Sequence, residues 1–272
     1  MDNEAYLSSL RTGTLAAMSP TPPRSIALID ESYPDADALD TGVSRAMLLA
    51  ASEGRMGEAF RIHRPGRIVA FGKHDSITDG FNEAVAIART KGFLPIVRLA
   101  GGRAAVFHEH TLAFNWTVPA TDPTRDIHDR FRMLSNVMVG AFGSLGLDAR
   151  IGQVPGEYCP GEFSVNLEGT LKVMGVGQRL ARNAAHIGGV VVVDNAAIIN
   201  DALIPIYEAL GLDMDPAATG ALSDRAPGIT TADVVDAVLE QVRHLGELIP
   251  TRLDPHILAI ARELADGHIA DS

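Results

Sequence analysis

The segment "GEYCPGEFSVNLEGTLKVMG", residues 156–175, contains the residues best suited to chemistry. It holds Cys159, the only cysteine of the chain, and further along Lys172, which lies within an apolar run. A thiolate is a strong nucleophile, but a thiol with a pKa of about 8.5 needs a nearby cation or a helix N-terminus to lower that pKa. Cys159 and Lys172 are therefore candidates for a nucleophile and the cation that activates it.

Both residues also have a purely structural interpretation. A structural free cysteine usually occupies an apolar element as a small hydrophobe, whereas Cys159 lies between Tyr158 and Pro160, in a predicted turn. For Lys172, a charge on a solvated strand face is the commoner interpretation. Spacing alone leaves both interpretations of the pair open.

A second candidate is the turn in "VRLAGGRAAVF", residues 97–107. Arg98 follows an apolar strand pattern, and Gly101 and Gly102 would let the main chain approach a bound molecule closely. A plain glycine turn between two strands explains the same pattern equally well.

Three other motifs do not indicate a binding site. "GVGQRL", residues 175–180, has Leu180 where a dinucleotide fingerprint needs a glycine or alanine. "FGKHDS", residues 71–76, lacks the first glycine and the Ser or Thr of a phosphate loop. "HEH" places His108 and His110 on one face of a predicted strand, but no third metal ligand has a suitable spacing, so an exposed strand end is favoured.

The elements that must position these residues alternate between helix and strand. Strands are predicted at residues 25–30, 67–72, 93–99, 104–107, 112–118 and 186–193, with a hairpin over 162–176 that turns at Glu168, Gly169 and Thr170. Helices are predicted at residues 41–54, 78–92, 127–145, 201–211, 230–246 and 254–267. Thr230 and Asp233 have the spacing of a capping box. The sequence therefore predicts an α+β fold, a mixed β-sheet flanked by helices, with a helical C-terminal part.

Composition and charge exclude several classes of protein. The length of 272 residues, 46% of them hydrophobic and 21% charged, fits a globular fold of one or two domains. The net charge of −11 disfavours binding to nucleic acid or to an anionic membrane. The first residues lack the apolar run of a secretory signal, and the longest aliphatic block, residues 187–193, is too short to span a bilayer. We therefore expect a cytoplasmic protein in which Cys159 is a free thiol.

Two segments in collinear order, residues 67–107 and 156–193, resemble the cofactor transferase superfamily of lipoate-protein ligases, octanoyltransferases and biotin-protein ligases. The most specific part is the "YCPG" turn followed by Gly169, Lys172, Gly175, Gln178 and Arg179. Within the superfamily the chain is most similar to the octanoyl-[glycine cleavage H protein]:protein N-octanoyltransferases. The resemblance implies a fold of the biotin/lipoate-protein ligase catalytic-domain type. It places the acyl-transferase domain at residues 25–250, between a flexible segment, 1–24, and a helical tail, 251–272.

The resemblance also implies a role for each candidate residue. Cys159 would carry the acyl group as a thioester, and Lys172 would lower the thiol pKa and hold the acyl carbonyl. The residues implied to bind the substrate are Arg98, Ala100, Gly101, Gly102, Gly175 and Gln178. The ε-amine of a lysine on an acceptor protein would then attack the thioester. This two-step reaction suits a cysteine, because a thiolate is both a good nucleophile and a good leaving group. The implied reaction needs no ATP, metal or other cofactor.

The implied substrate is an octanoyl or lipoyl group. Its donor would be an acylated glycine cleavage H protein or an acyl carrier protein, and its acceptors the lipoyl domains of 2-oxoacid dehydrogenase complexes. Two departures from the family pattern leave the identity of the acyl chain open. Ala100 stands where serine is usual before the two glycines, and Arg103 stands where a small or apolar residue is common.

Three alternative functions differ in how they would use the candidate residues. An ATP-dependent lipoate-protein ligase of the same fold would bind an acyl-adenylate with Lys172 but would leave Cys159 without a role. A non-catalytic module that only holds an acyl chain would need neither residue. A biotin ligase is disfavoured because the chain lacks a nucleotide loop of the Gly-Arg-Gly-Arg type. The sequence therefore favours the acyltransferase, with the donor protein left open.

Overall fold

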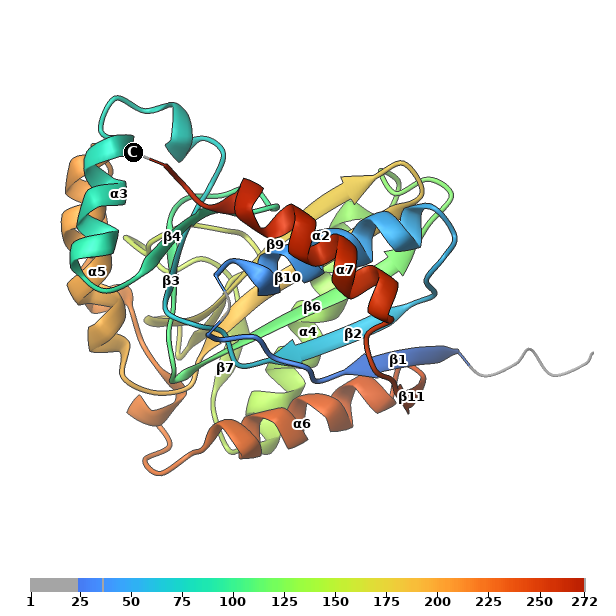
Figure 1. Ribbon diagram of the computed structural model, residues 1–272. Coiled ribbons are helices and arrows are strands. Elements are labelled where there is room, and N and C mark those ends of the chain that lie inside the picture. The colour runs from blue at the N-terminus through green and yellow to red at the C-terminus, as the bar shows by residue number, and fades with distance from the viewer. Residues whose placement is uncertain (1–23, 36, 272) are drawn as a thin grey trace, which may run out of the picture.

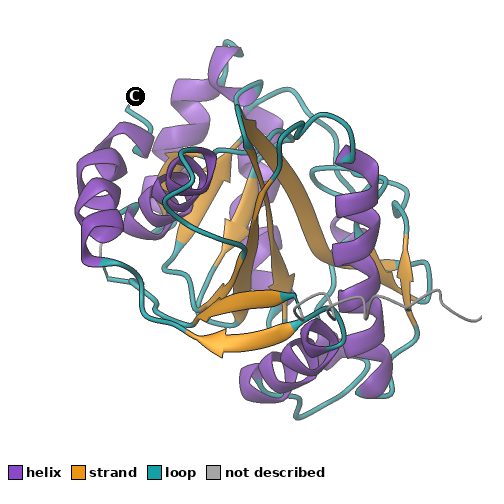
Figure 2. Ribbon diagram, turned by 90° about the vertical axis from the view of Figure 1, so that its right-hand side faces the viewer, coloured by secondary structure: helices purple, strands orange, loops and turns teal. Residues whose placement is uncertain are grey.

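The computed structural model of the chain describes residues 24–35 and 37–271. These residues form two mixed sheets with helices packed around them (Figures 1 and 2). In this part of the chain the larger sheet has eight strands, in the order β11 (Glu247–Pro250), β1 (Ser25–Ile29), β2 (Ala59–His63), β6 (Thr111–Pro119), β10 (Ala184–Val192), β9 (Leu171–Ala181), β8 (Val165–Leu167) and β7 (Ala149–Ile151). The smaller sheet consists of β4 (Leu94–Val97), β3 (Ile68–Phe71) and β5 (Ala105–Phe107).

The helices cover both sheets. The α-helices of the described residues are α2 (Leu39–Ser52), α3 (Phe81–Thr90), α4 (Ile127–Ser144), α5 (Ala196–Ala209), α6 (Thr231–Arg243) and α7 (Pro255–Ala265). α4 and α6 pack together in one hydrophobic core with the large sheet, and α7 packs onto α2. α3 and α5 lie side by side beside the small sheet (Figure 1). None of these helices is both long and apolar enough to cross a membrane.

Alternation along β6 explains how the large sheet is covered on its two faces. Leu112, Phe114 and Trp116 point to one face and join the core that contains α4 and α6. Asn115 points to the other face, because successive side chains of a strand alternate, and it donates a hydrogen bond to Ser44 of α2. The face under α2 thus carries buried polar groups, whereas the opposite face is apolar.

The predicted fold class is confirmed, and each helix and strand predicted above by its residue range has a counterpart in the structure. The hairpin of β8 and β9 turns at Glu168 and Gly169, which have φ angles of 57° and 76°. Two residues with positive φ are typical of tight hairpin turns. The predicted capping box is present at α6, where Thr230 and Asp233 bond each other's backbone N–H.

Three strands escape prediction from the sequence. β2 is buried along its whole length yet contains Arg61 and His63, which an apolar pattern does not predict. β7 has only three residues, and β11 has four, one of which is Pro250. β11 pairs with β1 and completes an edge of the large sheet within the otherwise helical C-terminal part.

The strand placement predicted for "HEH" is wrong. Residues 108–110 form the turn between β5 and β6, and His108 is fully buried rather than exposed. The backbone N–H of His110 donates to His108 Nδ1 at 3.2 Å. Among residues 24–35 and 37–271, no group of three His, Cys, Asp or Glu side chains could hold a metal ion.

The domain boundaries stay a prediction. The segment predicted to be flexible, residues 1–24, lies outside the described residues except for Arg24. In the predicted helical tail, α7 shares a hydrophobic core with α2, and Ile269 forms an isolated bridge with Ile96 of β4. The C-terminal segment therefore packs onto the same body as the rest of the chain.

Candidate active site

The loop between β7 and β8 presents Cys159 in a constrained backbone conformation. Its φ angle is 43°, in the left-handed region that residues other than glycine rarely adopt. The Cys159 N–H donates to Tyr207 Oη of α5 at 2.7 Å, and Tyr207 Oη donates to Ala104 O at 3.0 Å. Lys172 Nζ of β9 donates to the carbonyls of Tyr158 and Cys159 at 2.8 and 2.7 Å. Contacts from two elements therefore hold the strained loop in place.

Two donors from the turn after β4 contact the sulfur of Cys159. Arg98 Nη2 lies 3.1 Å from Sγ, and the backbone N of Arg103 lies 3.2 Å from it. Burial raises the pKa of the thiol, but the charge of Arg98, the charge of Lys172 and the two hydrogen bonds outweigh burial, so the pKa lies below its ordinary value. The arrangement favours the thiolate, the nucleophilic form of cysteine.

Lys172 is fully buried and makes its contacts with the loop rather than with the sulfur. Besides the two carbonyls, its ammonium donates to Glu157 Oε1 at 3.0 Å. An ammonium has three N–H bonds, so these three acceptors leave none for the sulfur or for an acyl carbonyl. Lys172 therefore fixes the loop and contributes charge from a distance, whereas Arg98 is the cation that contacts the sulfur.

Glu157 balances the charge of Lys172 and ties the loop together. Its side chain is fully buried, and Oε1 also accepts hydrogen bonds from Gly161 N at 3.1 Å and Ser164 Oγ at 2.8 Å. Oε2 accepts one from Val154 N at 2.9 Å. Because removal of one partner would leave the other charge buried and uncompensated, this ion pair is a structural requirement of the loop.

The two glycines of the Arg98 turn differ in what they allow. Gly102 has a φ angle of 98°, and a Cβ built there would lie 2.8 Å from Cys159 Sγ and 2.4 Å from Arg98 Nη2. A Cβ on Gly101 would meet no described atom within 4 Å. Close approach of the main chain to the thiol therefore requires glycine at position 102 but not at position 101.

A cavity of about 270 Å³ opens beside the sulfur. The predicted site residues that line it are Cys159, Lys172, Arg98, Gly101, Gly102, Gly175 and Gln178. Arg103, the departure from the family pattern, does not line it, because its guanidinium pairs with Asp75 Oδ1 at 3.1 Å. The structure thus brings the two predicted motifs together around one space.

Gln178 and Ala100 contribute less directly to the site around the Cys159 sulfur. The Gln178 amide accepts from Arg130 Nε at 2.6 Å and donates to Ile127 O at 3.2 Å, so its polar groups hold α4. Ala100 lines a second cavity instead and packs against β9, where a Cβ on Gly177 would lie 2.7 Å from the Ala100 Cβ.

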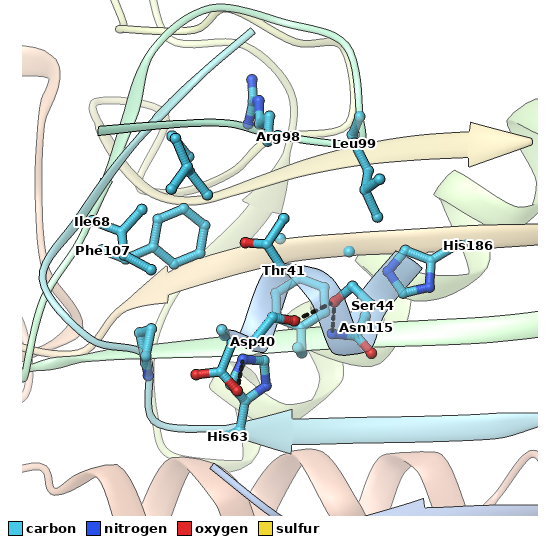
Figure 3. Close-up of a pocket in the computed structure, with 18 residues that line it drawn as sticks. Asp40, Thr41, Ser44, His63, Ile68, Arg98, Leu99, Phe107, Asn115 and His186 are labelled. Carbon is cyan, nitrogen blue, oxygen red and sulfur yellow. Dashed lines mark hydrogen bonds and ion pairs between the residues drawn. The ribbon is translucent and has the colours of Figure 1, made fainter. Parts of the chain in front are cut away.

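The second cavity, of about 110 Å³, lies between α2 and the sheets (Figure 3). Arg98, Phe107, Gly188 and Gly189 line both cavities, so the two adjoin. The first cavity lies at the sulfur of Cys159, and the second lies beyond the shared residues, under α2. We refer to the two adjoining cavities as the channel.

Sequence reasoning missed Glu157, Tyr207 and the contact between Arg98 and the sulfur. Glu157 has a local signal, since it is an acidic residue in the same turn as the candidate thiol. Tyr207 has no such signal, and neither has the contact of Arg98 with the sulfur. The two residues lie 48 and 61 positions from Cys159 and reach it only through the packing of α5 and the small sheet.

Comparison with solved structures identifies the fold. The chain matches lipoate-protein ligase A bound with ATP with a TM-score of 0.73 and 18% sequence identity, over 89% of this chain and 95% of that one. It matches a putative lipoate protein ligase from T. acidophilum with bound lipoic acid with a TM-score of 0.71 and 19% identity, over 90% and 96% of the two chains. At these identities the likeness establishes the fold alone, which is that of the lipoate-protein ligases.

Comparison of sequences places the chain in a family. Residues 42–243 match the lipoyl protein ligase A/B catalytic domain, and the chain belongs to this family, which confirms the resemblance. Similar curated proteins, each named octanoyl-[GcvH]:protein N-octanoyltransferase, include one from Geobacillus kaustophilus, 26% identical over 68% of this chain and 66% of that protein. Another, from Exiguobacterium sp., is 28% identical over 51% of this chain and 49% of that protein. The chain thus spans about half to two thirds of the length of these two relatives.

Proposed function

We propose that the protein is an acyltransferase that moves an octanoyl or lipoyl group from a carrier protein, through a thioester on Cys159, to a lysine of an acceptor protein. The observation that carries this proposal is the position of the Cys159 sulfur, in contact with Arg98 and the Arg103 N–H and beside a cavity of about 270 Å³. The names of the curated relatives support the glycine cleavage H protein as donor. Acyl carrier protein is the alternative donor, and lipoyl domains are the acceptors.

In the first step the Cys159 thiolate attacks the carbonyl carbon of the acyl-lysine amide on the donor. The S–C bond forms, the C–N bond breaks, and the departing lysine amine takes up a proton from solvent. With acyl carrier protein as donor, the bond that breaks is a C–S bond and a thiol departs. The Arg98 guanidinium prepares this step, because a nearby cation favours the charged form of a thiol.

In the second step the neutral ε-amine of an acceptor lysine attacks the thioester. The N–C bond forms, the C–S bond breaks, and the nitrogen releases a proton to solvent while the Cys159 thiolate is restored. The contacts with Arg98 and the Arg103 N–H stabilise this thiolate again, so the same groups serve both steps. Neither step uses a nucleotide.

The residues divide into reacting groups and positioning groups. Cys159 is the nucleophile, and Arg98 touches the reacting sulfur. Lys172 is a positioning residue, since its donors hold Glu157 and the loop carbonyls. Gly102 permits the approach of the Arg98 turn to the sulfur. The other predicted residues form the walls of the channel.

Transfer in the absence of nucleotide tests the proposal. The protein is incubated with octanoylated H protein and an unmodified lipoyl domain, with and without ATP, and acylation of the domain is followed by mass spectrometry. We expect equal transfer in both reactions and none in Cys159→Ala. Acylation of the domain from free octanoate that needs ATP and survives in Cys159→Ala, tested in a parallel reaction, would identify an ATP-dependent ligase instead. Octanoyl-acyl carrier protein, tested in parallel, decides between the two donors.

A further inference from the structure

The cavity under α2 has an apolar side and a polar side (Figure 3). Leu99, Ile68 and Phe107 lie on the side near Arg98. On the other side lie the polar residues Asp40, Ser44, His63, Asn115 and His186. These polar residues come from α2, β2, β6 and β10. A chain that entered past Arg98 would therefore end against polar side chains.

Several of the polar groups have protein partners that explain their presence. Arg61 forms an ion pair with Asp40. His186 Nδ1 lies 2.9 Å from Thr117 Oγ1, and Ser44 Oγ donates to Asp40 O at 3.1 Å. These contacts are satisfied within the protein and do not require a ligand.

Two buried groups on the polar side have no such partner. Asn115 is 4% exposed, and its Nδ2 donates to Ser44 Oγ at 3.2 Å, which leaves Oδ1 unpaired among the described residues. Turning the amide over would still leave one of its ends unpaired. His63 is 6% exposed, and its Nδ1 is likewise unpaired within residues 24–35 and 37–271.

The proton of His63 can be placed from its neighbours. Arg61 Nη1 lies 3.4 Å from His63 Nε2, whereas Asp40 Oδ1 is 3.7 Å away. A guanidinium can only donate, so Nε2 accepts and Nδ1 carries the proton. Within the described residues, the polar side of the cavity thus presents one unpaired acceptor, Asn115 Oδ1, and one unpaired donor, His63 Nδ1–H, while Arg98 Nε, which is also unpaired, belongs to the opposite side.

The two groups come from neighbouring strands and face the same side of the sheet. β2 and β6 are antiparallel neighbours, with Arg61 opposite Asn115 and His63 opposite Ala113. His63 and Asn115 are therefore diagonal neighbours on the face under α2. Residues at such diagonal positions are about 7–8 Å apart, a gap that an imidazole, a carboxamide and a small group between them can bridge.

We infer that this cavity selects an acyl chain that carries a hydroxyl group near its far end, an inference that rests on the proposed function. A hydroxyl donates one hydrogen bond and accepts another, so it can pair with Asn115 Oδ1 and His63 Nδ1–H together. A plain octanoyl chain would bury a methyl group against both and leave them unpaired, which buried polar groups seldom are.

The charge of the cavity agrees with a neutral ligand group. Burial is the main reason why the pKa of His186 falls to about 4 and that of His63 falls well below its ordinary value. Neither ring is charged at neutral pH, and the charges of Asp40 and Arg61 balance each other. A hydroxyl therefore fits this end better than a carboxylate.

Loading of Cys159 from small thioesters tests the inference without any donor protein. The probes are N-acetylcysteamine thioesters of octanoate and of hydroxyoctanoates with the hydroxyl on the last, second-last or third-last carbon, and acyl-enzyme formation is followed by intact mass. We expect at least one hydroxyoctanoyl thioester to load about tenfold faster than octanoyl, the size expected of hydrogen bonds to buried groups. If octanoyl loads as fast as every hydroxyoctanoyl probe, the inference is overturned and the proposed function stands. If no probe loads, the inference is overturned, and transfer from octanoylated H protein decides the proposed function separately.

A substitution in the cavity provides a second, independent measurement. Asn115→Leu removes the acceptor and should reverse the preference, so that octanoyl loads faster than the hydroxyoctanoyl probes, a result that misfolding cannot produce. Asn200→Leu is the matched control, because Asn200 also has a buried Oδ1 without a partner in the described part of the chain but lines neither cavity. It should leave the preference unchanged. An unchanged preference in a folded Asn115→Leu protein would contradict the inference, and the wild-type comparison decides alone if that variant does not fold.

Discussion

At the scale of single residues, two cations act on Cys159 in different ways. Arg98 donates to the sulfur itself, whereas Lys172 donates to Glu157 and to the carbonyls of the loop. The sequence pairs Cys159 with Lys172, because the two share a segment and Arg98 does not. The contact that stabilises the thiolate most strongly therefore comes from a different motif than the one that the sequence favours.

Arg98→Met should raise the pKa of the Cys159 thiol, because it removes the charge that favours the thiolate most. The pH profile of alkylation by iodoacetamide should then move to higher pH, and further than in Lys172→Met. Arg98→Lys keeps a charge without the planar donor fork, so its profile should lie between those of wild type and Arg98→Met. Coinciding profiles for wild type and Arg98→Met would show that the guanidinium does not stabilise the thiolate.

Lys172→Met should lower the free energy of unfolding by about 3–5 kcal/mol, because it leaves the Glu157 carboxylate buried without its cation. The double variant Lys172→Met, Glu157→Gln removes both charges and should recover a large part of the loss. Urea unfolding followed by circular dichroism measures both variants. A double variant no more stable than Lys172→Met would mean that the ion pair is not the reason for the loss.

At the scale of elements, the turn after β4 sets how closely the main chain approaches the sulfur. Gly102→Ala places a methyl group 2.8 Å from Cys159 Sγ, in a φ region that side chains disfavour. We expect acyl loading to slow by about tenfold or more, or about 1.4 kcal/mol of barrier, with a stability loss of about 1–2 kcal/mol. Intact mass after timed loading and thermal unfolding measure the two effects.

Gly101→Ala is the matched control for this change, since its Cβ meets no described atom within 4 Å. It should slow loading less than Gly102→Ala does, because it leaves the sulfur without a new contact, and it should keep stability within about 0.5 kcal/mol of wild type. Equal effects of the two substitutions would mean that the turn is sensitive to any side chain, and that contact with the sulfur is not the cause.

Some elements depend on residues that are close together in the sequence, and these elements could be predicted. Elements that depend on distant contacts could not. The turn of the β8–β9 hairpin and the cap of α6 depend on residues within a few positions of one another, such as Glu168 with Gly169 and Thr230 with Asp233. β2 is different, because Arg61 is buried in an ion pair whose partner, Asp40, belongs to α2. A strand stabilised by such a distant contact has no apolar pattern to reveal it.

At the scale of the whole molecule, the site joins segments that are far apart in the sequence. α3, α5 and the small sheet share one core with Tyr158, and this packing brings Tyr207 and the Arg98 turn to the Cys159 loop. Cys159, Lys172 and the Arg98 turn could each be found as a local motif. The channel could not, because its polar end depends on which strands lie side by side under α2.

The central claim is that Cys159 itself carries the acyl group between donor and acceptor. The most direct measurement is the intact mass of the protein after incubation with octanoylated H protein, without nucleotide and without acceptor, followed by an acid quench. The account predicts one added octanoyl mass that hydroxylamine removes, that peptide mapping places on Cys159, and that is absent from Cys159→Ala. Efficient transfer to a lipoyl domain by a protein that never shows this adduct, or by Cys159→Ala, would contradict it.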